Sequence, residues 1–252
     1  MPIRWLLIEV GNTHAKFAVA TGDRIQPRRL RVPTRALDRA ALDRVRKLLR
    51  FDRVIVCSVV PRRTLFLRRS FGAGLLEVSA SSDLSFSLTG YQNAHTIGAD
   101  RLANLEGALA AGIRPPLVAV DAGTATTFDV LDAQGRFCGG VIAPGPALFT
   151  DYLPARAAQL PAVKANPRRP PSILAKSTRA AIAAAAVPGF RGMAQELLIQ
   201  IRAALGVRTI RVIATGGAGD WIGSSKSRSV TRDPDLTFRG MLAIARRNAP
   251  GL

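Results

Sequence analysis

Short apolar runs separated by turn residues dominate the first part of the chain. Trp5–Val10 and Ala15–Ala20 flank the turn Gly11-Asn12-Thr13-His14 and predict a β-hairpin. A third strand is expected over Arg28–Val32, after the turn signal at Gly22-Asp23. The chain therefore opens as an antiparallel meander.

Helical and strand patterns then alternate. Apolar residues at helical spacing predict a helix over Arg35–Leu49, with Thr34 placed to cap it. The β-branched run Val54–Val60 predicts a buried central strand, which Pro61 stops. Two further elements complete this first α/β unit: a helix over Arg62–Ser70 and a strand over Leu75–Ser79.

The second part of the chain repeats this order. A helix opens at Gly98 and runs through Ala111, where Gly112 and Pro115-Pro116 end it. The elements expected after it are strands over Leu117–Asp121, Thr126–Leu131 and Gly135–Ile142, helices over Ser177–Ala186 and Gln195–Leu205, a strand over Thr209–Ala214, and a helix over Leu236–Arg247. The pattern predicts two similar α/β domains, over 1–112 and 113–252, with the closing helix near 236–247 able to pack back on the first.

Composition indicates a globular cytoplasmic protein. The 252 residues are 48% hydrophobic and 21% charged, and no apolar run approaches the ~20 residues that cross a bilayer. Glu9 interrupts the first apolar run early, which disfavours a signal peptide. Cys57 and Cys138 lack a paired-motif spacing and are expected to be small buried side chains in a reducing compartment.

The formal charge of +19 has two interpretations. One is nucleic-acid binding, and the other is an arginine-rich composition of solvated faces that also helps to attract anionic ligands. The basic residues are spread along the chain, and aromatic residues, which stack on bases, make up only 6%. We favour the second interpretation and expect only weak, salt-dependent binding of DNA.

Three polar segments carry candidate chemistry. Glu9-Val10-Gly11-Asn12-Thr13 and Asp121-Ala122-Gly123-Thr124-Ala125 each follow an apolar strand, and Gly98-Ala99-Asp100-Arg101 opens a helix. A strand end of this kind presents a carboxylate, a hydroxyl and backbone N–H groups beside a glycine that lets a ligand approach. Two such units in one chain suggest related halves that close around a nucleotide phosphate chain, as in a kinase. His14 and His95 are too few and too isolated to indicate a transition-metal site.

These segments and several others occur in the order found in one family. The matching segments are Glu9–Thr13, Ser58-Val59-Val60-Pro61, Tyr91-x-Asn93, Gly98–Arg101, Asp121–Ala125, Gly139–Gly145, Ser177-Thr178, Thr215-Gly216-Gly217 and Leu236–Met241. Over nearly its full length the chain resembles the type III pantothenate kinases of the actin-like, sugar-kinase and Hsp70 ATPase superfamily. The resemblance implies two RNase H-like domains with the active site in the cleft between them. It also implies ATP-dependent phosphorylation of pantothenate to 4'-phosphopantothenate, the first step of coenzyme A biosynthesis.

The resemblance also assigns roles. Asp100 would be the general base that takes the proton of the pantothenate hydroxyl, and Asp121 would hold a monovalent cation, K⁺ or NH₄⁺. The residues implied to contact ATP are Glu9, Gly11, Asn12, Thr13, Lys16 and Thr124, and those implied to contact substrate are Tyr91, Gly98, Ala99, Arg101 and Thr178. Mg²⁺ would accompany ATP, and a homodimer is expected because family members place the active site at a subunit interface.

Three positions depart from the family pattern. Glu9 replaces the usual aspartate, Ala94 stands where a proline follows Asn93, and Ala183–Ala186 occupies a stretch where a glycine is expected. Two alternatives to the pantothenate kinase therefore stay open. One is a catalytically weakened relative that acts as a regulatory or binding protein, and the other is a kinase of the same superfamily with another small substrate.

Overall fold

Two compact units make up the structure, a computed structural model that describes residues 2–222 and 230–249. The first unit holds the described residues up to Arg114 together with those from Asp235 onward, and the second holds those between Pro115 and Pro234. The final helix of the chain therefore belongs to the first unit. Among the described residues, no helix is both long enough and apolar enough to cross a membrane.

A five-stranded mixed sheet forms the centre of the first unit, in the order β3-β2-β1-β4-β5. Strands β1 (Arg4–Val10), β2 (His14–Thr21) and β3 (Arg24–Pro33) form the expected antiparallel meander. Strands β4 (Arg53–Ser58) and β5 (Leu75–Glu77) continue the sheet parallel to β1.

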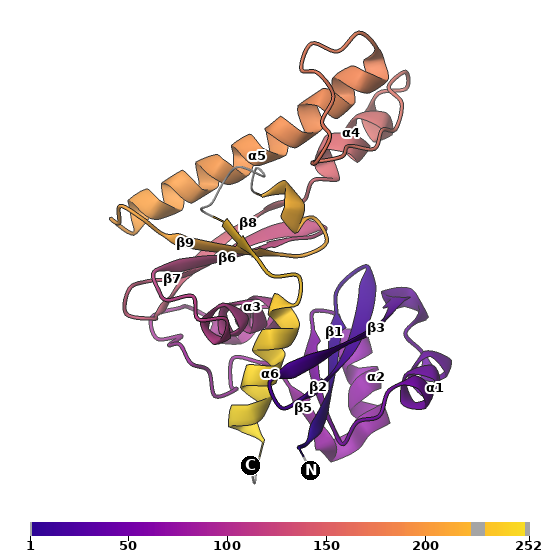
Figure 1. Ribbon diagram of the computed structural model, residues 1–252, viewed down its shortest axis with the longest axis vertical. Coiled ribbons are helices and arrows are strands. Elements are labelled where there is room, and N and C mark those ends of the chain that lie inside the picture. Colours follow the sequence, from indigo (N-terminus) through magenta and orange to yellow (C-terminus); the bar gives the residue numbers. More distant parts are fainter. Residues whose placement is uncertain (1, 223–229, 250–252) are drawn as a thin grey trace. The chain divides into compact units, whose positions relative to one another are not determined.

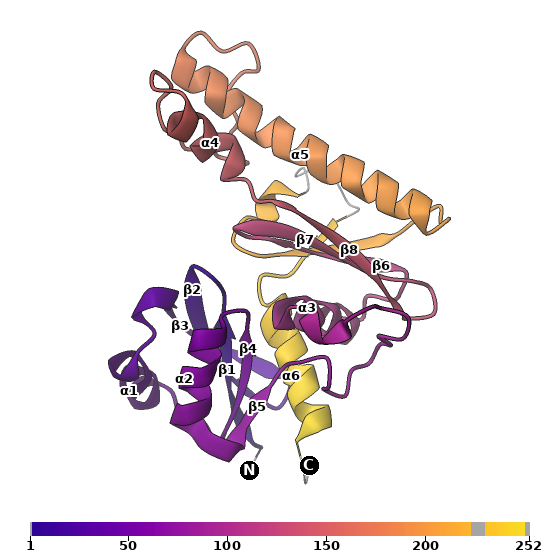
Figure 2. The same cartoon turned by 180° about the vertical axis from the view of Figure 1, so that it is seen from behind.

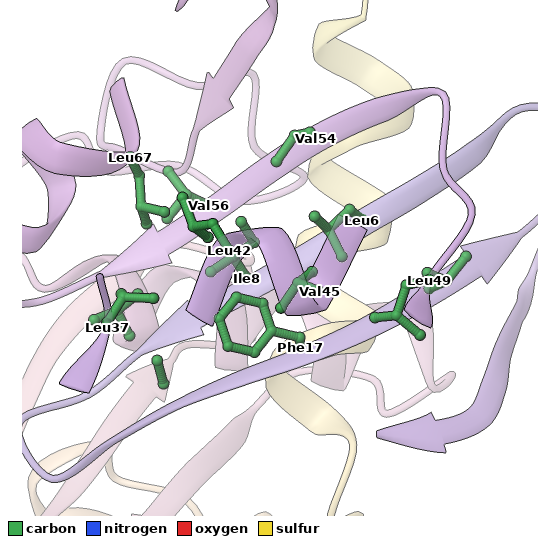
Figure 3. Close-up of a cluster of buried hydrophobic side chains, with 13 residues drawn as sticks. Leu6, Ile8, Phe17, Leu37, Leu42, Val45, Leu49, Val54, Val56 and Leu67 are labelled. Atoms are coloured by element: carbon green, nitrogen blue, oxygen red, sulfur yellow. The ribbon is translucent and has the colours of Figure 1, made fainter. Parts of the chain in front are cut away.

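Helices cover both faces of this sheet (Figures 1 and 2). On one face, α1 (Arg39–Leu48) and α2 (Pro61–Phe71) pack through Leu42, Val45 and Leu67 against Phe17 and other apolar side chains of the sheet (Figure 3). On the other face lie α3 (Ala99–Ala110) and α6 (Leu236–Asn248). The strands β1, β2 and β4 are thus covered on both sides, which explains their nearly continuous apolar residues, whereas the edge strand β3 is partly exposed.

The crossing of α3 and α6 depends on two glycines. A Cβ atom on Gly240 would overlap the carbonyl of Ala103, and one on Gly107 would overlap the carbonyl of Leu236. A buried hydrogen bond of 2.8 Å from the Thr237 hydroxyl to Asn104 joins the same helices. The close approach holds the last helix of the chain on α3, the helix that carries Asp100.

The second unit repeats the topology of the first. Its sheet has the order β10-β9-β6-β7-β8, with an antiparallel meander followed by parallel strands. The strands are β6 (Leu117–Ala122), β7 (Ala125–Leu131), β8 (Phe137–Pro144), β9 (Arg211–Thr215) and β10 (Val230–Arg232). Since β6 occupies the place of β1, Asp121 and Glu9 have equivalent positions, each the next-to-last residue of its central strand.

One long helix covers a face of the second sheet, where two helices were predicted. Helix α5 (Thr178–Ala204) runs without interruption through Pro188 (Figure 1). Packing offsets the hydrogen bond that proline removes, because the Phe190 ring makes edge-to-face contacts with Phe149 and Trp221 at centroid distances of 6.4 and 5.9 Å. Phe149 belongs to α4 (Leu148–Arg156), a helix that the sequence pattern did not predict. Strand β10 was also missed.

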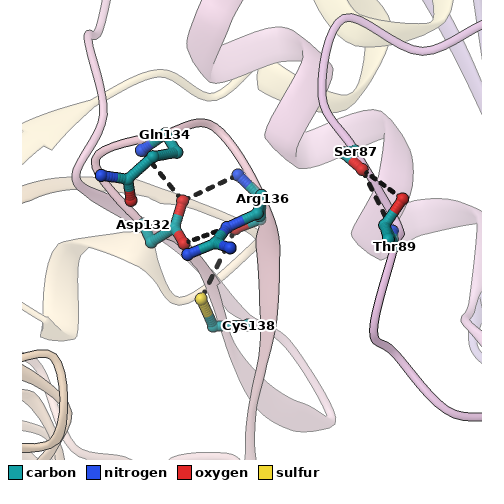
Figure 4. Close-up of polar contacts among 6 residues, drawn as sticks. All are labelled: Ser87, Thr89, Asp132, Gln134, Arg136 and Cys138. Atoms are coloured by element: carbon teal, nitrogen blue, oxygen red, sulfur yellow. Dashed lines mark hydrogen bonds and ion pairs between the residues drawn. The ribbon is translucent and has the colours of Figure 1, made fainter.

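Two local predictions were wrong. Thr34 does not cap a helix, since it begins a 3-10 turn, and α1 is capped by Asp38, whose carboxylate accepts from the Ala41 N–H at 2.9 Å. Cys138 is exposed on β8, where its Sγ lies 3.5 Å from the Arg136 carbonyl oxygen beside the β7–β8 turn (Figure 4). Cys57 is buried, as expected.

Candidate active site

The turn between β1 and β2 is closed and braced by backbone contacts. The Gly11 N–H donates to the His14 carbonyl at 3.0 Å, and the Thr34 N–H donates to the Thr13 carbonyl at 3.0 Å. The buried Thr34 hydroxyl donates to the Gly11 carbonyl at 2.6 Å. Asn12 and Thr13 stay exposed at the tip, where a ligand can reach them. Sequence reasoning missed this role of Thr34, because a threonine before an amphipathic helix is also the usual signal of a cap.

Glu9 and Lys16 form an ion pair below this turn. They are direct cross-strand partners on β1 and β2, so their side chains share one face of the sheet. The Lys16 Nζ lies 2.7 Å from Glu9 Oε1, and the glutamate side chain is 17% exposed against 40% for the lysine. The lysine thereby orients the longer carboxylate that stands in place of the family aspartate.

Asp100 lies in the first turn of α3, and its carboxyl is largely removed from water. Burial raises the pKa of the Asp100 carboxyl, and repulsion by the charge of Glu9 raises it further, against the opposing effect of the Arg101 N–H, which donates to Oδ1 at 2.8 Å. The helix dipole also favours the charged form of a carboxylate near a helix N-terminus. The effect of burial is larger, so the pKa of Asp100 is raised and its carboxylate has the increased proton affinity that suits a general base.

Gly98 makes room for this carboxylate. A Cβ atom at position 98 would lie 2.6 Å from Asp100 Oδ1 and 3.6 Å from a methyl carbon of Val59. The backbone of Gly98 has φ −56° and ψ 136°, which any residue can adopt. The need for glycine here therefore comes from the position of the Asp100 side chain.

The remaining candidate residues of the first unit surround the start of α3. Ala99 is its buried first residue, and Arg101 follows Asp100 with a half-buried side chain. Tyr91 is also half-buried, in the segment that leads to α3. Near it, Asn93 adopts a left-handed conformation with φ 54°, which asparagine tolerates better than most residues.

In the second unit, Asp121 lies beside a glycine from the neighbouring strand. Asp121 pairs with Thr215 of β9, and Gly216 follows at once with φ +86°. A Cβ atom on Gly216 would overlap both Asp121 Oδ1 and the carbonyl oxygen of Ala122. Two oxygen atoms therefore converge on the space that Gly216 leaves open. The sequence motif contained Gly216, but only the sheet register brings it to Asp121.

Thr124 lines an open pocket of about 380 Å³ in the same unit. The Gly145 N–H donates to the Thr124 carbonyl at 3.0 Å, and a Cβ atom at position 145 would overlap the backbone of Gly123 and Thr124. Asp151 and Tyr152 of α4 line the other side of the pocket. The β6–β7 turn is thus open to a ligand. Gly145 and Gly216 pack so closely against this turn and the end of β6 that neither position has room for a Cβ atom.

Thr178 lies on another element of the second unit. It is the exposed first residue of α5, after the capping residue Ser177, whose hydroxyl accepts from the Ala180 N–H at 3.3 Å. The N-terminal end of α5 lies beside α4 (Figure 1). The structure therefore groups Glu9 with Lys16 and Asp100, and Asp121 with the turn of Thr124, while Thr178 stands on another element.

The oxygen ligands of both units suit hard cations. Among the described residues no three histidine, cysteine or acidic side chains gather closely enough to hold a metal ion alone. Mg²⁺ is usually bound through one or two carboxylates and the substrate phosphates, so Glu9 fits an ion that arrives with a nucleotide. The Asp121 carboxylate and the Ala122 carbonyl oxygen beside Gly216 are also oxygen ligands, of the type that could hold a monovalent cation.

Comparisons with known sequences agree on one family. A family model described as type III pantothenate kinase matches residues 5–200. A type III pantothenate kinase from Akkermansia muciniphila is 41% identical over 244 residues, which cover 97% of this chain and 99% of that protein. One from Rhodospirillum centenum is 38% identical over 261 residues, covering 97% and 98% of the two chains.

Solved structures bear out the fold. A Campylobacter jejuni protein described as a Baf family transcriptional activator aligns with a TM-score of 0.61 at 22% identity, over 98% of this chain and 100% of that one. A Sinorhizobium meliloti protein named as a 2-dehydro-3-deoxygalactonokinase aligns with a TM-score of 0.59 at 14% identity, over 98% of both. The predicted fold class, α/β with two similar domains, is confirmed.

Proposed function

We propose that this chain, which belongs to the type III pantothenate kinase family, transfers the γ-phosphoryl group of ATP to pantothenate and yields 4'-phosphopantothenate and ADP. The reaction is the first step of coenzyme A biosynthesis. The observation that carries the proposal is the environment of Asp100. Its carboxyl is half-buried at the start of α3, close to the charge of Glu9, and Gly98 leaves space for it.

Asp100 is the general base of the proposed reaction. It accepts the proton of the pantothenate hydroxyl while that oxygen attacks the γ-phosphorus, and the bond from the γ-phosphorus to the bridging oxygen breaks to release ADP. The raised pKa of Asp100 makes its carboxylate a better proton acceptor than an exposed aspartate. Arg101 offers a planar guanidinium to the pantothenate carboxylate, and Tyr91, Gly98 and Ala99 shape the same substrate site.

The two strand–turn segments hold the nucleotide. Gly11, Asn12 and Thr13 form the turn that faces the phosphates, where Asn12 and Thr13 offer short polar side chains and Thr34 supports the turn through the Gly11 carbonyl. Lys16 holds Glu9 toward the same region. Thr124 contacts the nucleotide from the second unit. Glu9 would hold the Mg²⁺ that accompanies ATP, which would supply positive charge for the transfer, and Asp121 would hold K⁺ or NH₄⁺.

A homodimer is part of the proposal. Thr178 is the exposed first residue of α5, and the family resemblance gives it a substrate contact at an active site that lies at a subunit interface. We place the enzyme in the cytoplasm, where ATP is available and where the thiols of Cys57 and Cys138 stay reduced. No observation favours the regulatory protein or a kinase with another substrate.

The deciding experiment is an assay of the purified protein with ATP, Mg²⁺ and pantothenate, with potassium present and absent. We expect 4'-phosphopantothenate and ADP to form in equal amounts, and faster with potassium. A variant with Asp100→Asn, which keeps the size of the side chain, is the matched control for a contaminating kinase. Product formation at the same rate by wild type and variant would contradict the proposal.

A further inference from the structure

A second pocket, of about 410 Å³, lies in the second unit at the start of α5. Three cationic side chains line it: Lys164 and Arg169 from the segment before the helix, and Arg179 from its first turn. All three residues are exposed, and none of the described residues that line the pocket is acidic. It is distinct from the pocket that Thr124 lines, with which it shares no lining residue.

The stretch of sequence that forms this pocket contains no acidic residue. Between Asp151 and Glu196 the chain has no aspartate or glutamate, although Arg156 and Arg191 add further positive charge to the same stretch. Within the part of the chain that the structure describes, none of the three lining cations has an ion pair with an acid. Like charges around one concave surface repel each other, and a bound anion relieves that repulsion.

The segment that carries Arg169 is anchored. The N–H of Arg168 donates to the Asn166 side chain at 2.9 Å, and the Arg168 guanidinium pairs with Asp220 at 2.8 Å. Arg191 of α5 donates to the Pro167 carbonyl at 3.2 Å. The charge of Arg168 is thereby paired with that of Asp220, while the neighbouring Arg169 lines the pocket. These contacts reduce the entropy lost when Arg169 binds a ligand.

The nature of the lining indicates the ligand class. Guanidinium groups bind phosphate through two parallel hydrogen bonds, and lysine adds a compact charge. The N-terminal end of a 27-residue helix adds partial positive charge on the same side. Pockets for small organic ligands span ~300–1,000 Å³, so this one has room for more than an inorganic ion. We propose that the pocket formed by Lys164, Arg169 and Arg179 binds a small organic phosphate at a site separate from the nucleotide.

Titration calorimetry with inorganic pyrophosphate as the probe tests this site. The wild-type protein is saturated with ADP and pantothenate beforehand, so that the nucleotide and substrate sites are both filled. We expect binding that weakens with salt, and an affinity about tenfold lower in Arg169→Gln and in Arg179→Gln, since each loses a charge-assisted contact. Both side chains are exposed, so the melting temperature should not change. If either variant fails to fold, Lys164→Gln takes its place.

The matched control is Arg202→Gln, which removes an exposed cation from the last turn of the same helix. We expect its affinity to stay within about twofold of wild type. The absence of pyrophosphate binding, an equal loss in Arg202→Gln, or unchanged affinity in the pocket variants would each overturn the proposal. The site does not depend on the kinase reaction, and pyrophosphate binding in Asp100→Asn separates the two, since that variant should keep it.

Discussion

Replacement of Gly98 by alanine should disable Asp100 while leaving the fold in place. The new Cβ atom would lie 2.6 Å from Asp100 Oδ1, whereas ordinary contacts begin at 3.4 Å. The carboxylate oxygen must therefore retreat by about 0.8 Å, and a displacement near 1 Å in a group that positions reactants costs ~100-fold in rate. That factor corresponds to about 2.7 kcal/mol of transition-state stabilisation.

The cost to stability should be much smaller. The backbone at Gly98 is in a region open to alanine, and the crowded atom is the end of a short side chain that can rotate. An alanine at a helix N-cap costs ~1 kcal/mol, which lowers the melting temperature of a protein of this size by about 2–4 °C. Steady-state kinetics and a thermal melt on the same preparation measure both quantities.

Gly192→Ala is the matched control, because its Cβ would meet nothing within 4 Å on an exposed helix position. It should leave kcat unchanged and stabilise the protein by about 0.5–1 kcal/mol. A Gly98→Ala enzyme with kcat within about twofold of wild type would refute the reasoning, because a displacement of this size in a positioned reacting group should cause a large loss of rate. The reasoning would also be refuted if the Gly98→Ala enzyme lost activity because it unfolds at the assay temperature.

Four further predictions concern charge at the site. Asp100→Asn should keep substrate binding and lower kcat by ~100-fold or more, and full activity would remove Asp100 from the mechanism. Glu9→Gln should move the acid limb of the rate profile to lower pH, because loss of the repelling charge lowers the raised pKa of Asp100, and an unmoved limb would contradict this. Glu9→Asp should leave kcat unchanged or lower it, since the shorter arm withdraws from Lys16, and a several-fold gain would show that the glutamate impairs the wild type. Asp121→Ala should lose the preference for potassium over sodium together with ATP binding, whereas equal wild-type rates in both salts would count against a cation at Asp121.

The order of strands and helices followed from the sequence because hydrophobic periodicity is a local signal. The meander of Trp5–Val10 and Ala15–Ala20, the β-branched run after Arg53 and the helix after Gly98 all lie within a residue or two of their expected bounds. The strand–turn motifs were local as well, and they were sufficient to identify the family. Where long-range packing contributes, the pattern was wrong: Pro188 lies inside a helix in which Phe190, two residues later, packs edge to face against Phe149 and Trp221.

Only the tertiary structure decided how the motif residues meet. Thr34 has the local signature of a helix cap, yet its hydroxyl braces the turn at Gly11, 23 positions earlier. Gly216 is a turn glycine in the sequence, and the register of β9 on β6 makes it the residue that leaves space beside Asp121. Such contacts join residues far apart along the chain, so no local pattern encodes them, and they exist only once the strands have paired and the sheets are covered. The sequence by itself determined which chemistry the chain can carry, and the folded structure determined which atoms stand close enough to perform it.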